Sequence, residues 1–196
     1  MKRPHILYEL LRLESRGLKQ AAVRGMGWTS VSTLTRLIIT LVSTPILARM
    51  LSPHDYGVAG MSALVIEIVA LFGEFGFHTS LIQRQRISRL DLETAFWTNA
   101  AWGVFLAAMV AIGAPFFAAF FKTEALTAVL YVGAAGLVLT NLTGVHHTML
   151  VRAMRFRQLA LIEMGSGLVR VLVAIALTFQ EYGYWALVIG GVSGIL

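Results

Sequence analysis

The sequence predicts an all-α, polytopic membrane protein, and its composition and charge-free intervals support this prediction. Hydrophobic residues make up 57% of the chain and charged residues only 13%, whereas an ordinary soluble domain carries about a quarter charged residues. No Lys, Arg, Asp or Glu occurs between Glu93 and Lys122, or between Glu124 and Arg152. Each interval exceeds the ~20 residues that cross a bilayer as a helix. A water-soluble fold is excluded because its surface would be too poor in polar groups.

Apolar blocks bounded by charge clusters and turn signals divide the chain into membrane spans. Five complete spans are predicted at residues 25–50, 56–82, 94–121, 125–150 and 159–180. The connections between them are short, so neighbouring spans form antiparallel hairpins. A sixth span begins near Tyr184, with thirteen residues from there to Leu196. These supply about 20 Å of helix against a core of about 30 Å, which predicts a span truncated within the membrane.

Residues 1–24 form a basic segment ahead of the predicted transmembrane bundle, which covers residues 25–196. Ile6, Leu10 and Leu13 recur at helical spacing among basic residues, a pattern that suits a short amphipathic helix on an anionic leaflet. A solvated basic tail explains the same residues equally well. The segment lacks the apolar core and the small-residue cleavage site of a signal peptide, so we expect it to be retained.

The distribution of Lys and Arg predicts a cytoplasmic amino terminus. Six precede the first span, three follow the second span and three follow the fourth, whereas the opposite side carries only Arg49 and Lys122. Cytoplasmic loops retain positive charge, so the side with twelve basic residues is the cytoplasmic one.

Several functional classes are excluded by what the sequence lacks. The formal charge of +6 does not indicate nucleic-acid binding, because the basic residues lie in short clusters between spans, without interleaved aromatic residues. The chain has no cysteine. It contains no Walker loop, dinucleotide-binding fingerprint, HExxH motif or nucleophile elbow. His146 and His147 point about 100° apart on a helix, so no metal site is predicted. We therefore expect neither an enzyme nor a bound cofactor.

Four motifs occur in a fixed order along the chain: LARMLSPHDYG (47–57), FGEFGFHTSLIQR (72–84), TAFWTN (94–99) and MRFRQLALIE (154–163). In this order and spacing they resemble the first half of a Wzx-type polysaccharide flippase, of the colanic-acid exporter kind, in the MOP exporter superfamily. The resemblance runs from about Leu18 to the end. His78 departs from it, because relatives usually have a small residue there.

The resemblance implies two six-helix bundles that face each other around a central cavity in the bacterial inner membrane. It further implies movement of undecaprenyl-pyrophosphate-linked oligosaccharide between the leaflets. The expected partners are membrane lipids, the lipid-linked oligosaccharide and a second helical bundle that is missing from this chain. That missing bundle leaves transport by this polypeptide alone an open question.

Ionisable residues within the predicted spans are the candidate site residues, since each costs roughly 3 kcal/mol to insert and normally faces a cavity or a partner. Arg36 and Glu67 differ in depth by about 6 Å within the first hairpin, which allows an ion pair between them. Glu74 follows Glu67 by seven residues, and Arg170 follows Glu163 by seven, so each pair lies on one helix face.

Two interpretations of these charges remain open. In the first, both polar faces line a hydrated cleft in which Arg36 and Arg170 hold a pyrophosphate, because guanidinium binds phosphate oxygens bidentately. In the second, Arg36 and Glu67 neutralise each other and fix helix packing. Glu163 then lies close enough to the cytoplasmic surface to be hydrated. Glu74 is flanked by glycines that allow close helix approach, so a structural role fits it as well as a gating one.

Two weaker patterns concern contacts between helices. Asn99 and Asn141 are expected to hydrogen-bond between helices more readily than to bind a sugar hydroxyl. Gly190 and Gly194 form a GxxxG pattern, which is a weak signal for close packing.

The sequence therefore favours export of a lipid-linked polysaccharide precursor by alternating access. Three alternatives remain: a membrane-embedded polysaccharide polymerase or ligase, a truncated protein that binds partners without transporting, and a multidrug exporter of the same superfamily. A polymerase or ligase would be expected to carry a long periplasmic loop, and the predicted periplasmic loops are very short.

Overall fold

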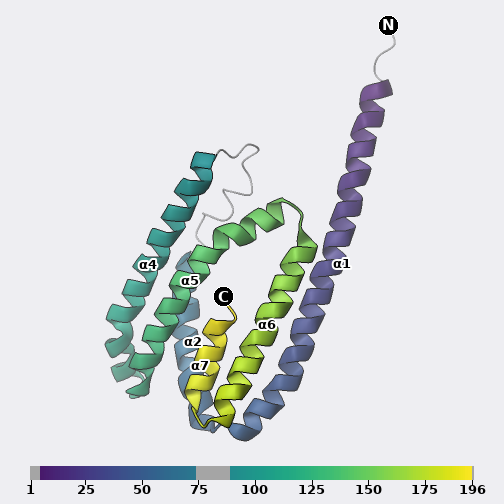
Figure 1. Ribbon diagram of the computed structural model, residues 1–196. Coiled ribbons are helices and arrows are strands. Elements are labelled where there is room, and N and C mark those ends of the chain that lie inside the picture. Colours follow the sequence, from purple (N-terminus) through teal and green to yellow (C-terminus); the bar gives the residue numbers. More distant parts are fainter. Residues whose placement is uncertain (1–4, 74–88, 196) are drawn as a thin grey trace.

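The computed structural model describes residues 5–73 and 89–195, which are helical apart from short turns (Figure 1). In chain order the helices are α1 (His5–Met50), α2 (Pro53–Gly73), α4 (Arg89–Phe120), α5 (Ala125–Arg152), α6 (Phe156–Phe179) and α7 (Tyr184–Ser193). No strand occurs within these two described ranges. The prediction of an all-α fold is confirmed.

Five helices in the described part of the chain are long and apolar enough to cross a membrane. The candidate spans are Gly25–Met50, Pro53–Phe72, Glu93–Phe120, Ala125–Val151 and Phe156–Phe179. They agree closely with the five predicted spans, except that the second prediction continues into residues 74–88, which lie outside the described ranges. The shorter apolar helix α7 stands where the sixth span was predicted. The chain is a multi-pass helical membrane protein.

Helix α1 continues without a break through residue 24, where the sequence predicts the start of the bundle. Its 46 residues correspond to about 70 Å of helix, more than twice the hydrocarbon core. Figure 1 shows the amino-terminal part of α1 extending beyond the ends of the other helices. The assignment of residues 1–24 to a cytoplasmic segment, and of residues 25–196 to a separate bundle, stays a prediction.

Helices α2, α4 and α5 enclose the larger of the two described apolar cores. Helix α4 packs most extensively against α5, and α2 contacts both. The face that α4 contributes includes the buried small residues Ala107, Ala114 and Ala118. Small residues let backbones approach closely, which matters in a membrane because lipid provides no hydrophobic force between helices. The core therefore depends on close packing as well as on its larger side chains.

Helix α1 packs along α6 and barely contacts α2, although α1 and α2 are consecutive in the chain. Near one end of this pair, Gly25 leaves room for the ring of Phe156, since a Cβ at Gly25 would lie 2.5 Å from Phe156 Cδ2. Farther along, Ser32 contacts Glu163. Residue numbers rise together along both helices, so α1 and α6 run in the same direction.

Helix α7 packs against α6 through the glycines of the GxxxG pattern. A Cβ at Gly190 would lie 2.8 Å from Ala174 Cβ and 3.0 Å from the Arg170 carbonyl oxygen. A Cβ at Gly194 would lie 2.9 Å from Arg170 Nε and 3.1 Å from the Ser166 carbonyl oxygen. The close packing that GxxxG predicted is therefore confirmed. Helix α7 also contacts α2 and α5, so it joins the α1–α6 pair to the larger core.

Asp55 connects the turn before α2 to the turn before α7. Its Oδ2 accepts hydrogen bonds from the Ser52 amide and hydroxyl at 2.9 and 2.6 Å, and its own amide donates to Ser52 Oγ at 3.2 Å. This is a reciprocal helix cap, followed by Pro53 in the favoured first helical position. Asp55 Oδ1 accepts a hydrogen bond from the Tyr184 amide at 2.9 Å. Gly183 has a positive φ of 54°, and a Cβ there would lie 2.7 Å from Asp55 Oδ1.

Replacing Gly190 with leucine is expected to destabilise the protein, because the side chain would collide with the α6 backbone. Overpacking of this kind typically costs about 1–3 kcal/mol. The neighbouring Gly191 has open space around it, so Gly191→Leu is the matched control. The melting temperatures of the detergent-purified proteins should be lowered by Gly190→Leu alone. Equal melting temperatures for the two variants would contradict the packing.

The predicted orientation can be tested across α5, because the chain contains no cysteine. Glu124 immediately precedes α5 and Ala153 immediately follows it, and both are exposed. With a cytoplasmic amino terminus, a membrane-impermeant maleimide should label Glu124→Cys in intact spheroplasts and Ala153→Cys only after lysis. The reverse pattern would mean that the orientation is inverted.

Candidate functional site

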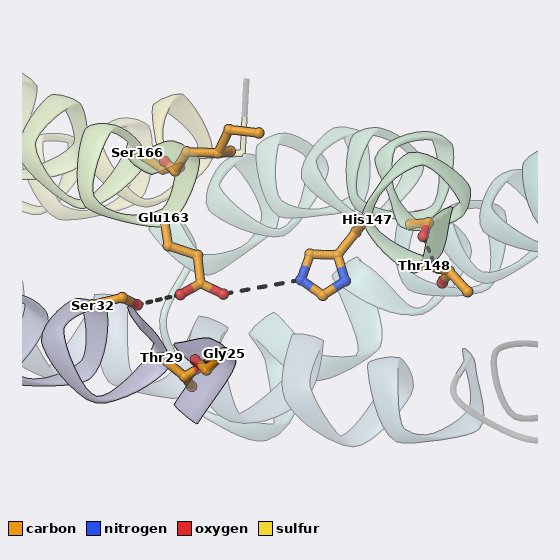
Figure 2. A network of polar contacts seen from close by, with 9 residues as sticks. Gly25, Thr29, Ser32, His147, Thr148, Glu163 and Ser166 are labelled. Atoms are coloured by element: carbon orange, nitrogen blue, oxygen red, sulfur yellow. Dashed lines mark hydrogen bonds and ion pairs between the residues drawn. The ribbon is translucent and has the colours of Figure 1, made fainter. Parts of the chain in front are cut away.

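Three helices meet at the carboxylate of Glu163, in the α6 helix. Ser32 of α1 donates a hydrogen bond from Oγ to Glu163 Oε2, and His147 Nε2 of α5 lies 4.0 Å from Glu163 Oε1. Figure 2 shows the carboxylate between the other two side chains. Residues 131 positions apart in the sequence are thereby joined by one hydrogen bond.

The Glu163 cluster, formed by Ser32, His147 and Glu163, combines a buried donor with accessible titratable groups. Ser32 is only 4% exposed, while the side chains of His147 and Glu163 are 54% and 43% exposed. A buried hydroxyl needs an acceptor, so the Ser32 bond holds α1 against α6. The contact with His147 becomes an ion pair only when the imidazole is protonated.

The fold places Glu163 beside a histidine that is distant from it in the sequence. The adjacent histidines have no carboxylate nearby in the sequence, yet the fold brings Glu163 to His147. In the described ranges, no group of three or more His, Cys, Asp or Glu residues is arranged to hold a metal ion. Predicting the cluster from sequence would have required knowing that α5 and α1 both approach α6.

Arg36 and Glu67 do not form the ion pair that their depths allowed. Both side chains are exposed, and the one ion-pair contact between described side chains is that of His147 with Glu163. The reason is that α1 packs along α6 and barely contacts α2. Arg36 lies one helical turn beyond Ser32, next to the seam between α1 and α6.

Arg170 lies where α6 meets α7. Its Nε is near Gly194, and its side chain remains exposed. Glu163 and Arg170 do not form an ion pair with each other. Glu74 lies outside the described residues, so the second predicted polar face cannot be followed beyond Glu67. The site roles proposed for these residues stay predictions.

The two asparagines of the bundle do not show the expected hydrogen bonds between helices. Asn141 Nδ2 donates to the Leu137 carbonyl oxygen of its own helix at 2.9 Å. Its side chain also packs where Gly103 leaves room in α4. Asn99 is 4% exposed, and its Oδ1 accepts no hydrogen bond from any described residue. Asn141 thus supports packing, and Asn99 keeps an unused acceptor inside the bundle.

Sequence reasoning missed Ser32 and Asp55 as structural partners. The sequence gives only a weak indication that Ser32 has a structural role, namely that it is a small polar residue one turn before Arg36. Asp55 had a stronger one: a Ser-Pro-x-Asp series matches a helix cap with Asp three residues after Ser. That pattern explains the turn at Ser52, but it contains no information about Tyr184, which is 129 residues away.

Comparisons with known proteins extend over most of the chain. The sequence profile of a family described as polysaccharide biosynthesis protein matches residues 46–196. The chain is 28% identical over 177 residues to the succinoglycan biosynthesis transport protein ExoT of Rhizobium meliloti, covering 86% of the chain and 34% of that protein. It is 27% identical over 172 residues to the teichuronic acid biosynthesis protein TuaB of Bacillus subtilis, covering 88% and 33%.

A shorter match joins the chain to the lipopolysaccharide biosynthesis protein WzxC of Escherichia coli. The two are 31% identical over 87 residues, which covers 44% of the chain and 18% of that protein. No solved structure matches the chain. The chain spans about a third or less of the length of these curated relatives.

The helices and these matches together define a class: a multi-pass helical membrane protein related to polysaccharide biosynthesis and transport proteins. Within that class, the chain belongs to the polysaccharide biosynthesis protein family, because the family profile covers residues 46–196. The resemblance that the four motifs indicated is confirmed.

The Ser32–Glu163 bond should show energetic coupling in a double-mutant cycle. Ser32→Ala and Glu163→Gln each weaken the contact, and we expect about 1 kcal/mol of coupling, because the hydroxyl is buried and the carboxylate is half exposed. Exposed Ser30, on the same helix, provides the control Ser30→Ala. Unfolding free energies of the purified variants give the coupling, and strictly additive effects would show that the bond contributes nothing.

Proposed function

We propose that the chain forms the amino-terminal bundle of a transporter that flips or exports undecaprenyl-pyrophosphate-linked oligosaccharide across the bacterial inner membrane. The observation that carries this proposal is the family match over residues 46–196, together with a relative named as a transport protein. The bundle works by alternating access against a second helical bundle, with its amino terminus in the cytoplasm. It acts as a transporter and not as an enzyme.

In this proposal Arg36 and Arg170 bind the diphosphate of the lipid carrier. Both side chains are exposed within candidate spans, and neither forms an ion pair with a described carboxylate. A charge within a span is costly unless it faces water or a partner, so these two sites suit a hydrated cavity. Guanidinium stays charged and binds phosphate oxygens bidentately. Glu67, Glu74 and Glu163 line the same cavity in this proposal.

The test uses a deletion of the gene that encodes this chain in its native host, complemented with full-length variants. Deletion should abolish extracellular polysaccharide and cause lipid-linked oligosaccharide to accumulate on the cytoplasmic side. The double variant Arg36→Ala/Arg170→Ala should restore extracellular polysaccharide to no more than about one tenth of the wild-type amount. The reason is that charged hydrogen bonds contribute about 1.5–3 kcal/mol. The control Arg49→Ala/Lys122→Ala, which also removes two exposed positive charges, should restore it fully.

The other possible outcomes would each contradict part of this proposal or favour a different function. Single repeat units at the cell surface of the deletion strain would favour a polymerase or ligase. Normal export after deletion would contradict a transport role and favour a partner-binding protein. Loss of drug resistance with normal polysaccharide would favour a multidrug exporter. Normal export by the Arg36→Ala/Arg170→Ala variant would disprove only the proposed diphosphate contacts.

A further inference from the structure

The turn between α5 and α6 and the start of the first candidate span together form a hollow at the membrane boundary. It is lined by residues of α1 and of this turn, among them Gly25, Trp28, Arg155, Phe156 and Arg157. A second hollow adjoins it, because both include Gly25 and Phe156. A candidate span begins at Phe156, the first residue of α6, and Gly25 follows the basic residue Arg24 in the sequence. Because basic residues flank the ends of membrane spans, we place the hollow at the level where lipid headgroups meet the hydrocarbon.

Local sequence explains why a hollow forms here. Gly25 has no side chain, and the Phe156 ring occupies the space that a Cβ would need. Met154 has a positive φ of 52°, which turns the chain sharply between α5 and α6. Two flexible apolar side chains remain accessible beside the hollow, with Met26 64% and Met154 44% exposed. The site thus combines a polar rim with apolar surface on which an acyl chain can lie.

The surroundings of Arg155 and Arg157 suit the binding of a phosphate group. The guanidinium carbon of Arg157 lies 5.7 Å from the centre of the Trp28 ring. This cation–π contact restrains the guanidinium plane while leaving N–H groups at its edge available, which lowers the entropic cost of binding. Arg155 is exposed at the start of α6. Among the described side chains, neither arginine is neutralised by a carboxylate.

We propose that this hollow is a binding site for the phosphate headgroup of an anionic phospholipid of the surrounding bilayer. Arg155 and Arg157 bind the phosphate oxygens, Trp28 holds the Arg157 guanidinium, and the acyl chains lie against Met26 and Met154. Basic pockets between transmembrane helices suit anionic headgroups, and Trp is favoured at the same depth. The site is separate from the charges within the spans, so it does not depend on the transport proposal.

The proposal is tested by titrating phosphatidylglycerol into the detergent-purified full-length protein and following its melting temperature. Phosphatidylcholine serves as the zwitterionic comparison. Phosphatidylglycerol should stabilise the wild type more strongly, and Arg155→Gln/Arg157→Gln should raise the lipid concentration required by at least about fivefold, the effect of roughly one lost surface cation. The control Arg49→Gln/Lys122→Gln removes the same charge from the opposite membrane side and should behave like the wild type.

A second variant keeps both positive charges and separates the proposed geometry from general charge attraction. Trp28→Leu should weaken phosphatidylglycerol binding about twofold to fivefold by removing the cation–π contact. Unchanged binding by Arg155→Gln/Arg157→Gln, or an equal loss in the Arg49→Gln/Lys122→Gln control, would overturn the proposal. Binding of a polyprenyl diphosphate at this site without binding of phosphatidylglycerol would also overturn it, by assigning the site to transported lipid.

Discussion

The absence of water from the bilayer core is the constraint on which this structure depends. Each backbone N–H and C=O group within the hydrocarbon needs a partner inside the protein, which leaves helices as the only way for this chain to cross. Side-chain hydroxyls follow the same rule: Thr29, Thr40 and Thr178 donate to carbonyl oxygens of their own helices. Because lipid does not drive helices together, their arrangement depends on small residues and on a few polar contacts.

Those polar contacts lie at two levels of the bundle. Asp55 joins the α1–α2 turn to the α6–α7 turn, while Glu163 joins α6 to Ser32 of α1 and approaches His147 of α5. Between these levels the helices are held mainly by close packing, as at Gly190. This arrangement makes the α1–α6 pair a unit that reaches the larger core mostly through α7.

The four arginines that the two proposals use fall into two pairs with different surroundings. Arg36 and Arg170 lie within candidate spans, where an exposed charge needs water or a partner. Arg155 and Arg157 line the hollow between α1 and the α5–α6 turn, where we propose that lipid phosphate neutralises them. The chain spans about a third of the length of ExoT and TuaB. In the proposed lipid site, Arg155 and Arg157 require only phospholipids of the surrounding bilayer for neutralisation.

The sequence by itself determined the helical class, the positions of the spans and the family, because hydropathy and motif order are local properties of the chain. Only the tertiary structure decided that α1 packs on α6, that Arg36 and Glu67 stay apart, and that Glu163 joins Ser32 and His147. Spans that are apolar on all sides do not indicate which face meets which neighbour. That choice depends on three-dimensional fit, such as Phe156 against Gly25, between residues distant in sequence.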